Sequence, residues 1–222
     1  MFSFFSKNKP PKKNVIFLGD RNLELPPKHY GFHSFTWAID DAKVLLEEVL
    51  KIPQDNTGIK PSLIGRIKND ETSKLFWQLI AINSAIYNAY PLLILDIPAP
   101  FLTEITEGLY DGVNGLSNEN GPISQVERNG MKGLILKYYE AIVDDYINYV
   151  PSEKGVITPI GNGNNTFQVF SKYICYAYSS DTDVLEDYSL LEKMALQHLI
   201  GEYPTDLMLS IRDNLKIKFV SE

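Results

Sequence analysis

The sequence predicts a mainly α-helical protein of the α+β class, in which six or seven helices are joined by a small sheet of short strands near the termini. Two observations predict the helices: apolar residues recur at steps of three and four, and residues 75–95 carry no charge. A third observation predicts the sheet. Residues 15–18 form a short apolar run, and residues 215–219 alternate apolar with charged side chains.

Length and composition fit one domain. The 222 residues are 44% hydrophobic and 22% charged, which is typical of a globular chain. We predict that residues 14–222 form a single globular domain and that residues 1–13 are a flexible tail. The phenylalanines of this tail precede its lysines, which is the reverse of a signal peptide. Its Phe and Lys side chains leave open a weak contact with an anionic membrane surface.

The uncharged stretch predicts the central helix of the core, at residues 72–90, followed by an extended run at 92–97. Apolar residues from Leu75 to Ile86 recur at helical spacing and share one face. The stretch has about the length of a membrane-spanning helix, roughly 20 residues. Gln78 and Asn83, however, would lack hydrogen-bond partners in hydrocarbon. We therefore predict a core helix and no stable membrane insertion.

Before this helix, the predicted order is a strand at 15–18, an irregular segment at 21–35, a helix at 36–51 and a connector at 53–68. Pro26, Pro27 and Gly31 argue against helix in the irregular segment. The helix at 36–51 turns an apolar stripe inward and its charged residues outward, with acidic side chains in its first turns.

After the central helix, we predict a short helix at 101–110, a loop at 111–121 and an amphipathic helix at 124–150. Residues 166–178 favour a helix, although a hairpin strand also fits. Asp183 and Glu186 have the form of a capping box, and they predict a helix that Gly201 and Pro204 end. One more helix, at 205–214, precedes the strand at 215–219, which we expect to pair with 15–18 or with 92–97.

Motifs with a known chemical mechanism are absent from the sequence. It contains no phosphate-binding glycine loop, no nucleophile elbow, no HExxH metal motif and no CxxC pair. Cys175 is the only cysteine, so the chain cannot form an internal disulfide, which favours a cytoplasmic location. His29 and His33 are too few for a zinc site without further ligands. We predict no cofactor, no metal and no catalytic residue.

The alternative function is a metal- or phosphate-dependent enzyme that uses Asp20 and Asp96. Both residues end short apolar runs, IFLGD and LILD. Carboxylates at the carboxyl ends of adjacent strands can hold Mg²⁺ and a phosphate. Aspartate after a strand is also a common turn residue, and that interpretation is favoured.

Charge favours a basic protein as the partner. Lys and Arg number 21 against 28 Asp and Glu, and the resulting net charge of −7 speaks against binding to a nucleic-acid backbone. We therefore predict a non-catalytic acidic binding protein that sequesters or inhibits a basic protein. Bacterial immunity proteins, which neutralise toxins, are small acidic proteins of this kind. The predicted contact residues come from acidic clusters and from a tyrosine-rich helix: Tyr139, Glu140, Asp144, Asp145, Asp181 and Asp183.

Overall fold

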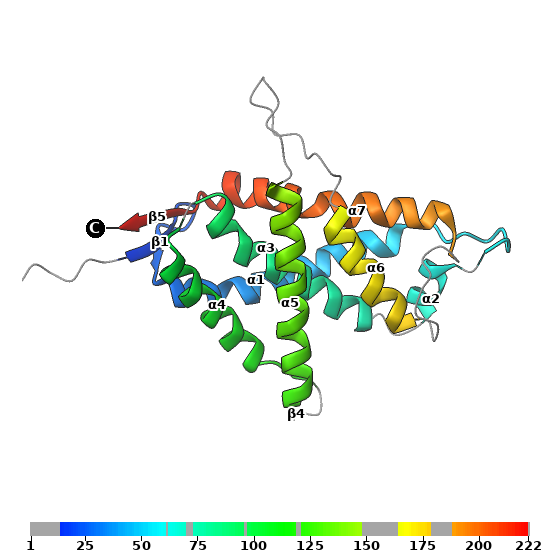
Figure 1. Cartoon of the computed structure of the whole chain (residues 1–222), viewed down its shortest axis with the longest axis horizontal. Helices are drawn as coiled ribbons and strands as arrows, with labels where there is room; N and C mark the ends of the chain where they lie inside the picture. Colours follow the sequence, from blue (N-terminus) through cyan, green and yellow to red (C-terminus); the bar gives the residue numbers. More distant parts are fainter. Residues whose placement is uncertain are drawn as a thin grey trace, which may run out of the picture.

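A computed structural model describes residues 14–60, 62–69, 73–95, 97–118, 121–147, 164–178 and 188–221. Within these ranges the chain forms seven α-helices, a three-stranded sheet and a two-stranded hairpin. The fold class predicted from the sequence is thus confirmed. The sheet lies at one end of the molecule and the short helix α2 at the other (Figure 1). The buried apolar residues of the described ranges form one core cluster.

The sheet joins the two ends of the described chain. Strand β1 (Asn14–Leu18) lies between β2 (Leu23–Leu25) and β5 (Lys218–Ser221), and both pairings are antiparallel. The expected pairing of the last strand with residues 15–18 is confirmed, but this strand begins at Lys218 instead of Leu215, which belongs to a π-helical turn. The predicted extended run at 92–97 is wrong, because helix continues to Leu93 and a turn follows at residues 94–95.

Helix α3 (Ser73–Leu93) is the centre of the fold, as its uncharged sequence predicts. It packs against α1 (Pro27–Lys51), α4 (Ala99–Asn114), α5 (Gln125–Ile147), α6 (Asn164–Tyr178) and α7 (Leu190–Ser210). Pro91 lies inside α3 without ending it. Because proline has no N–H, the Tyr87 carbonyl loses its helical partner, and the hydroxyl of the buried Tyr30 donates to that carbonyl instead, at 3.5 Å. A side chain from α1 thus supplies the hydrogen-bond donor that the Tyr87 carbonyl lacks within α3.

Helix α1 begins at Pro27, so the predicted irregular segment at 21–35 is wrong. Proline is tolerated at the first helical position, where its missing N–H would have no partner in any case. Gly31 allows α4 to approach α1 closely. A Cβ at Gly31 would stand 1.9 Å from the Ile105 carbonyl oxygen, and a Cβ at Gly108 would stand 1.8 Å from the Lys28 carbonyl oxygen. These two glycines set the contact between the helices.

Three further segments differ from the prediction. The connector contains a helix, α2 (Leu63–Asn69), whose Gly65 N–H donates to the Ser62 hydroxyl at 2.7 Å. Helix α4 extends to Asn114, and a hairpin of β3 (Ser117–Asn118) and β4 (Gly121–Pro122) follows it. Helix α5 begins with a capping box that the sequence analysis overlooked. The Ser124 N–H donates to the Glu127 carboxylate at 2.7 Å, and the Glu127 N–H donates to the Ser124 hydroxyl at 3.2 Å.

The C-terminal helices also differ in their limits. Residues 166–178 are helical, as favoured, in α6. Helix α7 passes through Gly201 and Pro204, which were predicted to end it, and merges with the helix expected at 205–214. Both residues are buried, so packing against the core outweighs their weak helical propensity. A π-helical turn, η2 (Ile211–Leu215), follows before β5. The predicted tail at 1–13 and the capping box at Asp183 lie outside the described residues.

Candidate binding pocket at Asp41

A pocket in the described part of the chain is lined by two carboxylates together with aromatic and polar side chains. It has a volume of about 340 Å³ and lies where α1 and α3 meet the C-terminal part of α7 and the turn η2. We call it the Asp41 pocket. Its acidic residues are Asp40 and Asp41, its aromatic residues are Trp37 and Tyr87, and its only basic residue is Arg21. The remaining lining residues are Leu207, Ser210, Ile211, Asn214 and Leu215.

Asp41 is a half-buried carboxylate held by one hydrogen bond. The hydroxyl of the buried Tyr87 on α3 donates to Asp41 Oδ2 at 2.8 Å. Burial raises the pKa of Asp41; the hydrogen bond from Tyr87 opposes this rise, and the neighbouring charge of Asp40 adds to it. Burial likewise raises the pKa of Tyr87, which keeps its proton and remains a donor. A carboxylate in this setting is stabilised by a nearby positive charge.

The rings of Trp37 and Tyr87 form an aromatic wall of the pocket, and the side chain of Arg21 already lies against it. The Arg21 guanidinium carbon lies 5.7 Å from the centroid of the half-buried Trp37 ring, within cation–π range. Trp37 in turn packs against Tyr87, with ring centroids 5.8 Å apart. Arg21 comes from the turn between β1 and β2, where Asn22 has a positive φ of 48°. This turn, and an ion pair with Asp20 at 3.3 Å, place Arg21 beside the wall.

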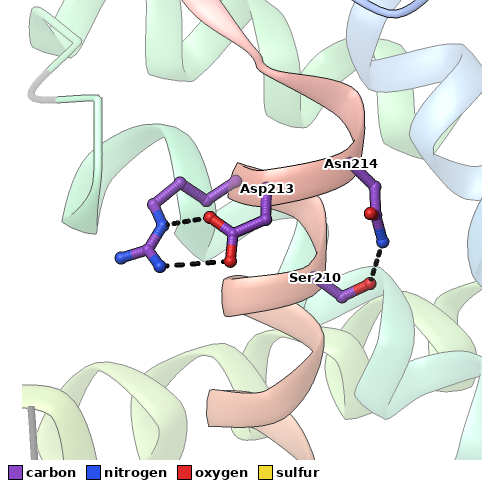
Figure 2. Close-up of polar contacts among 4 residues, drawn as sticks. Ser210, Asp213 and Asn214 are labelled. Carbon is purple, nitrogen blue, oxygen red and sulfur yellow. Dashed lines mark hydrogen bonds and ion pairs between the residues drawn. The ribbon is translucent and has the colours of Figure 1, made fainter.

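The turn η2 supplies the polar rim. Asn214 Nδ2 donates to Ser210 Oγ at 2.9 Å, and both residues line the pocket. Figure 2 shows Asp213 on the other side of the turn from Asn214 and Ser210. There Arg212 donates two hydrogen bonds to Asp213, at 2.8 and 3.2 Å, and these lower the pKa of the Asp213 carboxyl. The charges of this pair therefore balance each other away from the pocket, and the amide oxygen of Asn214 remains available at the rim.

The predicted contact residues on α5 lie outside this pocket. Glu140 is exposed and pairs with Lys137 at 3.4 Å, and Asp144 is also exposed. Tyr139 is half-buried, and burial raises its pKa. Figure 1 shows α5 crossing the neighbouring helices steeply, and none of its described residues lines the Asp41 pocket. The other two predicted residues, Asp181 and Asp183, lie outside the described part of the chain.

Asp145, the remaining predicted contact residue, is engaged within the fold. Its carboxylate accepts hydrogen bonds from the N–H of Asn165 at 3.0 Å, the N–H of Thr166 at 2.9 Å and the Thr166 hydroxyl at 2.8 Å. These donors belong to the first turn of α6, which has no intrahelical acceptors. Asp145 therefore caps α6 from the neighbouring helix α5.

Glu192 on α7 has a similar structural role. It is 1% exposed and accepts hydrogen bonds from the Asp55 N–H at 2.7 Å, the Ser62 hydroxyl at 2.6 Å and the Ile64 N–H at 3.1 Å. The carboxylate ties the connector and the start of α2 to α7. Its oxygens are already in use, which separates it from Asp41, where the structure shows one donor only.

Of the two aspartates in the alternative enzyme site, only Asp20 lies in the described part of the chain. Asp20 is exposed and pairs with Arg21, while Asp96 lies outside the described residues. Within the described ranges, no group of three or more His, Cys, Asp or Glu side chains is arranged to hold a metal. His29 and His33 lie on α1, contrary to the irregular segment predicted there. The ring of His33 stacks on Trp37, with centroids 6.2 Å apart.

Sequence reasoning found only part of the pocket. Asp40 and Asp41 are an acidic pair in the sequence, and such a pair on a helix is by itself typical of a solvated face. A local signal was present, because Trp37 and Asp41 are four residues apart and therefore neighbours on a helix. Tyr87 is 46 positions from Asp41, and Asn214 is still farther along the chain. No local pattern connects residues so distant in sequence.

Comparisons with protein-family models, with curated proteins and with solved structures found no match to this chain. Among the helices that the structure describes, none is long and apolar enough to cross a bilayer.

Proposed function

We propose that the protein is a non-catalytic binding protein whose partner is a basic protein, and that the Asp41 pocket is part of the contact. The observation that carries this proposal is the pairing of Asp40 and Asp41 with the aromatic wall of Trp37 and Tyr87 in one solvent-accessible pocket. Carboxylates beside aromatic faces are the groups that receive cationic side chains. A basic protein presents such side chains on its surface.

The charge of the whole chain supports the same partner. The net charge is −7, and residues 181–187 contain four acidic residues and no basic one: Asp181, Asp183, Glu186 and Asp187. Glu140 and Asp144 add exposed carboxylates on α5. Complementary charges accelerate association and discriminate against wrong partners. We propose these residues as secondary contacts outside the Asp41 pocket.

The proposed mode of action is inhibition by occupancy, as in a toxin-neutralising immunity protein. Such an inhibitor needs a complementary surface and no reacting group. A cytoplasmic location belongs to the same proposal, because the single cysteine allows no internal disulfide.

Affinity capture tests this function. The purified protein is immobilised, partners are captured from the lysate of its source at low salt, and bound proteins are eluted with rising salt and identified. The captured candidate is then purified, and its binding stoichiometry, salt dependence and activity are measured with and without the protein.

We expect a basic partner that binds stoichiometrically, dissociates more readily at high salt and loses its activity when bound. An acidic partner, a complex insensitive to salt, or the absence of any stoichiometric partner would refute the proposal.

A further inference from the structure

We infer that the Asp41 pocket binds the guanidinium group of an arginine side chain. This inference rests on the proposed function, because it names the group of the basic partner that enters the pocket. It does not require a toxin as the partner.

The Asp41 carboxylate has an oxygen that accepts no hydrogen bond from the described residues. Tyr87 occupies Oδ2 at 2.8 Å, and among the described residues no donor contacts Oδ1. The carboxylate is half-buried, so it has lost part of its hydration without gaining an ionic partner. Asp40, by contrast, is exposed and pairs with Lys43 at 2.8 Å. The pocket therefore offers one incompletely satisfied anion, Asp41, with Asp40 strengthening the negative potential at its rim.

The aromatic wall of Trp37 and Tyr87 faces the same pocket. Arg21 already places its guanidinium carbon 5.7 Å from the Trp37 ring centroid, which shows that this face accommodates a planar cation. Arg21 itself is an exposed side chain on a turn, with 54% of its side chain accessible. It can therefore move aside while keeping its ion pair with Asp20. An incoming arginine would displace Arg21 from the face of Trp37 and extend toward Asp41, with which Arg21 itself forms no ion pair.

The shape and hydration of the cation distinguish arginine from lysine. A guanidinium group is flat, stacks on an indole and offers several N–H donors in one plane, whereas the ammonium group of lysine is compact and strongly hydrated. Two residues of the pocket lining carry acceptor oxygens that take no hydrogen bond from the described residues: Asp41, at Oδ1, and Asn214, at its amide oxygen. Leu207 and Ile211 provide apolar surface for the methylene stem of the side chain. This combination fits arginine better than lysine.

The test uses small amides as probes. Isotope-labelled protein is titrated at low salt with N-acetylarginine amide, and the indole N–H signal of Trp37 is followed by NMR, with Trp77→Phe to assign the two tryptophans. N-acetylcitrulline amide is the neutral isostere, and N-acetyllysine amide is the second cation. We expect saturable binding of the arginine amide with a Kd on the order of 1–10 mM, binding of the lysine amide at least about threefold weaker, and no saturable shift with the citrulline amide.

Three variants are expected to change arginine binding differently: one weakens it, one strengthens it and one leaves it unchanged. Asp41→Asn keeps an acceptor for Tyr87 but removes the charge, and should weaken arginine binding about fivefold or more. Arg21→Ala empties the aromatic face and should strengthen binding about twofold to threefold. Glu104→Gln removes an equal charge from an exposed position on α4 outside the pocket, and should leave binding unchanged.

The inference is overturned by any of three results: no saturable shift with the arginine amide, an equal shift with the citrulline amide, or wild-type affinity in Asp41→Asn. Its failure is distinguishable from failure of the proposed function. A captured basic partner that binds Asp41→Asn as tightly as wild type refutes the pocket but not the function. Binding of the arginine amide without any basic protein partner refutes the function but not the pocket.

Discussion

The contact between α1 and α4 predicts that Gly108→Ala is severely destabilising. The added Cβ would stand 1.8 Å from the Lys28 carbonyl oxygen, against at least 3.4 Å for an ordinary contact, so the helices would have to separate by about 1.6 Å. The obstacle is backbone, which cannot rotate away. A gap of even 0.5–1 Å forfeits roughly a quarter to a half of a dispersion contact. Over the buried face that includes Ile105 and Leu109, we expect a loss of about 3 kcal/mol or more.

The assay is urea and thermal unfolding followed by circular dichroism. For a chain of this length, a loss of about 3 kcal/mol corresponds to a fall in Tm of roughly 6–12 °C. The matched control is Gly130→Ala on α5, where a Cβ would meet no atom within 4 Å. That variant should be unchanged or more stable by about 0.5–1 kcal/mol, because alanine favours helix. A Gly108→Ala protein within 1 kcal/mol of wild type would refute the packing argument.

Three further predictions concern carboxylates. Burial raises the pKa of Asp41, so the folded protein binds the proton of this carboxyl more tightly than the unfolded chain does. The resulting stabilisation is present below the ordinary pKa of Asp and is lost as pH rises through the pKa of Asp41 in the folded protein. Asp41→Asn should therefore be at least as stable as wild type near neutral pH and lose less stability between about pH 4 and pH 7 in urea titrations; a steeper loss would contradict this. Glu192→Ala leaves three donors without an acceptor, and should lower the free energy of unfolding by about 3 kcal/mol or more, whereas a loss below about 1 kcal/mol would contradict the assigned role. Asp145→Ala removes the cap of α6 and should cost about 1–2 kcal/mol, while the exposed control Glu140→Ala should change stability by less than about 0.5 kcal/mol; equal effects of the two would argue against the cap.

Local periodicity predicted the parts of the fold that depend on local pattern. The uncharged stretch is the central helix, the strand at 15–18 pairs with the last strand, and Met131, Ile135, Tyr138 and Ile142 form a buried stripe on α5 as expected. In each of these segments, the spacing of apolar residues predicts which side chains are buried. Neighbouring residues along the chain are sufficient to predict such elements.

The errors come from residues whose role is decided by distant partners. Gly31 argues against helix when judged alone, but it lies inside α1 because α4 crosses there. Pro91 and Pro204 lie inside helices, and the carbonyl freed by Pro91 finds the Tyr30 hydroxyl. The pocket was missed for the same reason. Tyr87 on α3 and the turn η2 form the environment of Asp41, and the sequence around Asp41 does not predict either contact.

The most direct test of the account is the footprint of the captured partner on this protein, measured by hydrogen–deuterium exchange in the complex and in the free protein. The account predicts slower exchange around residues 37–41 of α1 and in the turn η2, because these segments line the Asp41 pocket. It also predicts that Asp41→Asn weakens the complex. A footprint confined to other surfaces, with exchange at the pocket unchanged, would contradict the assignment of the Asp41 pocket as the contact site.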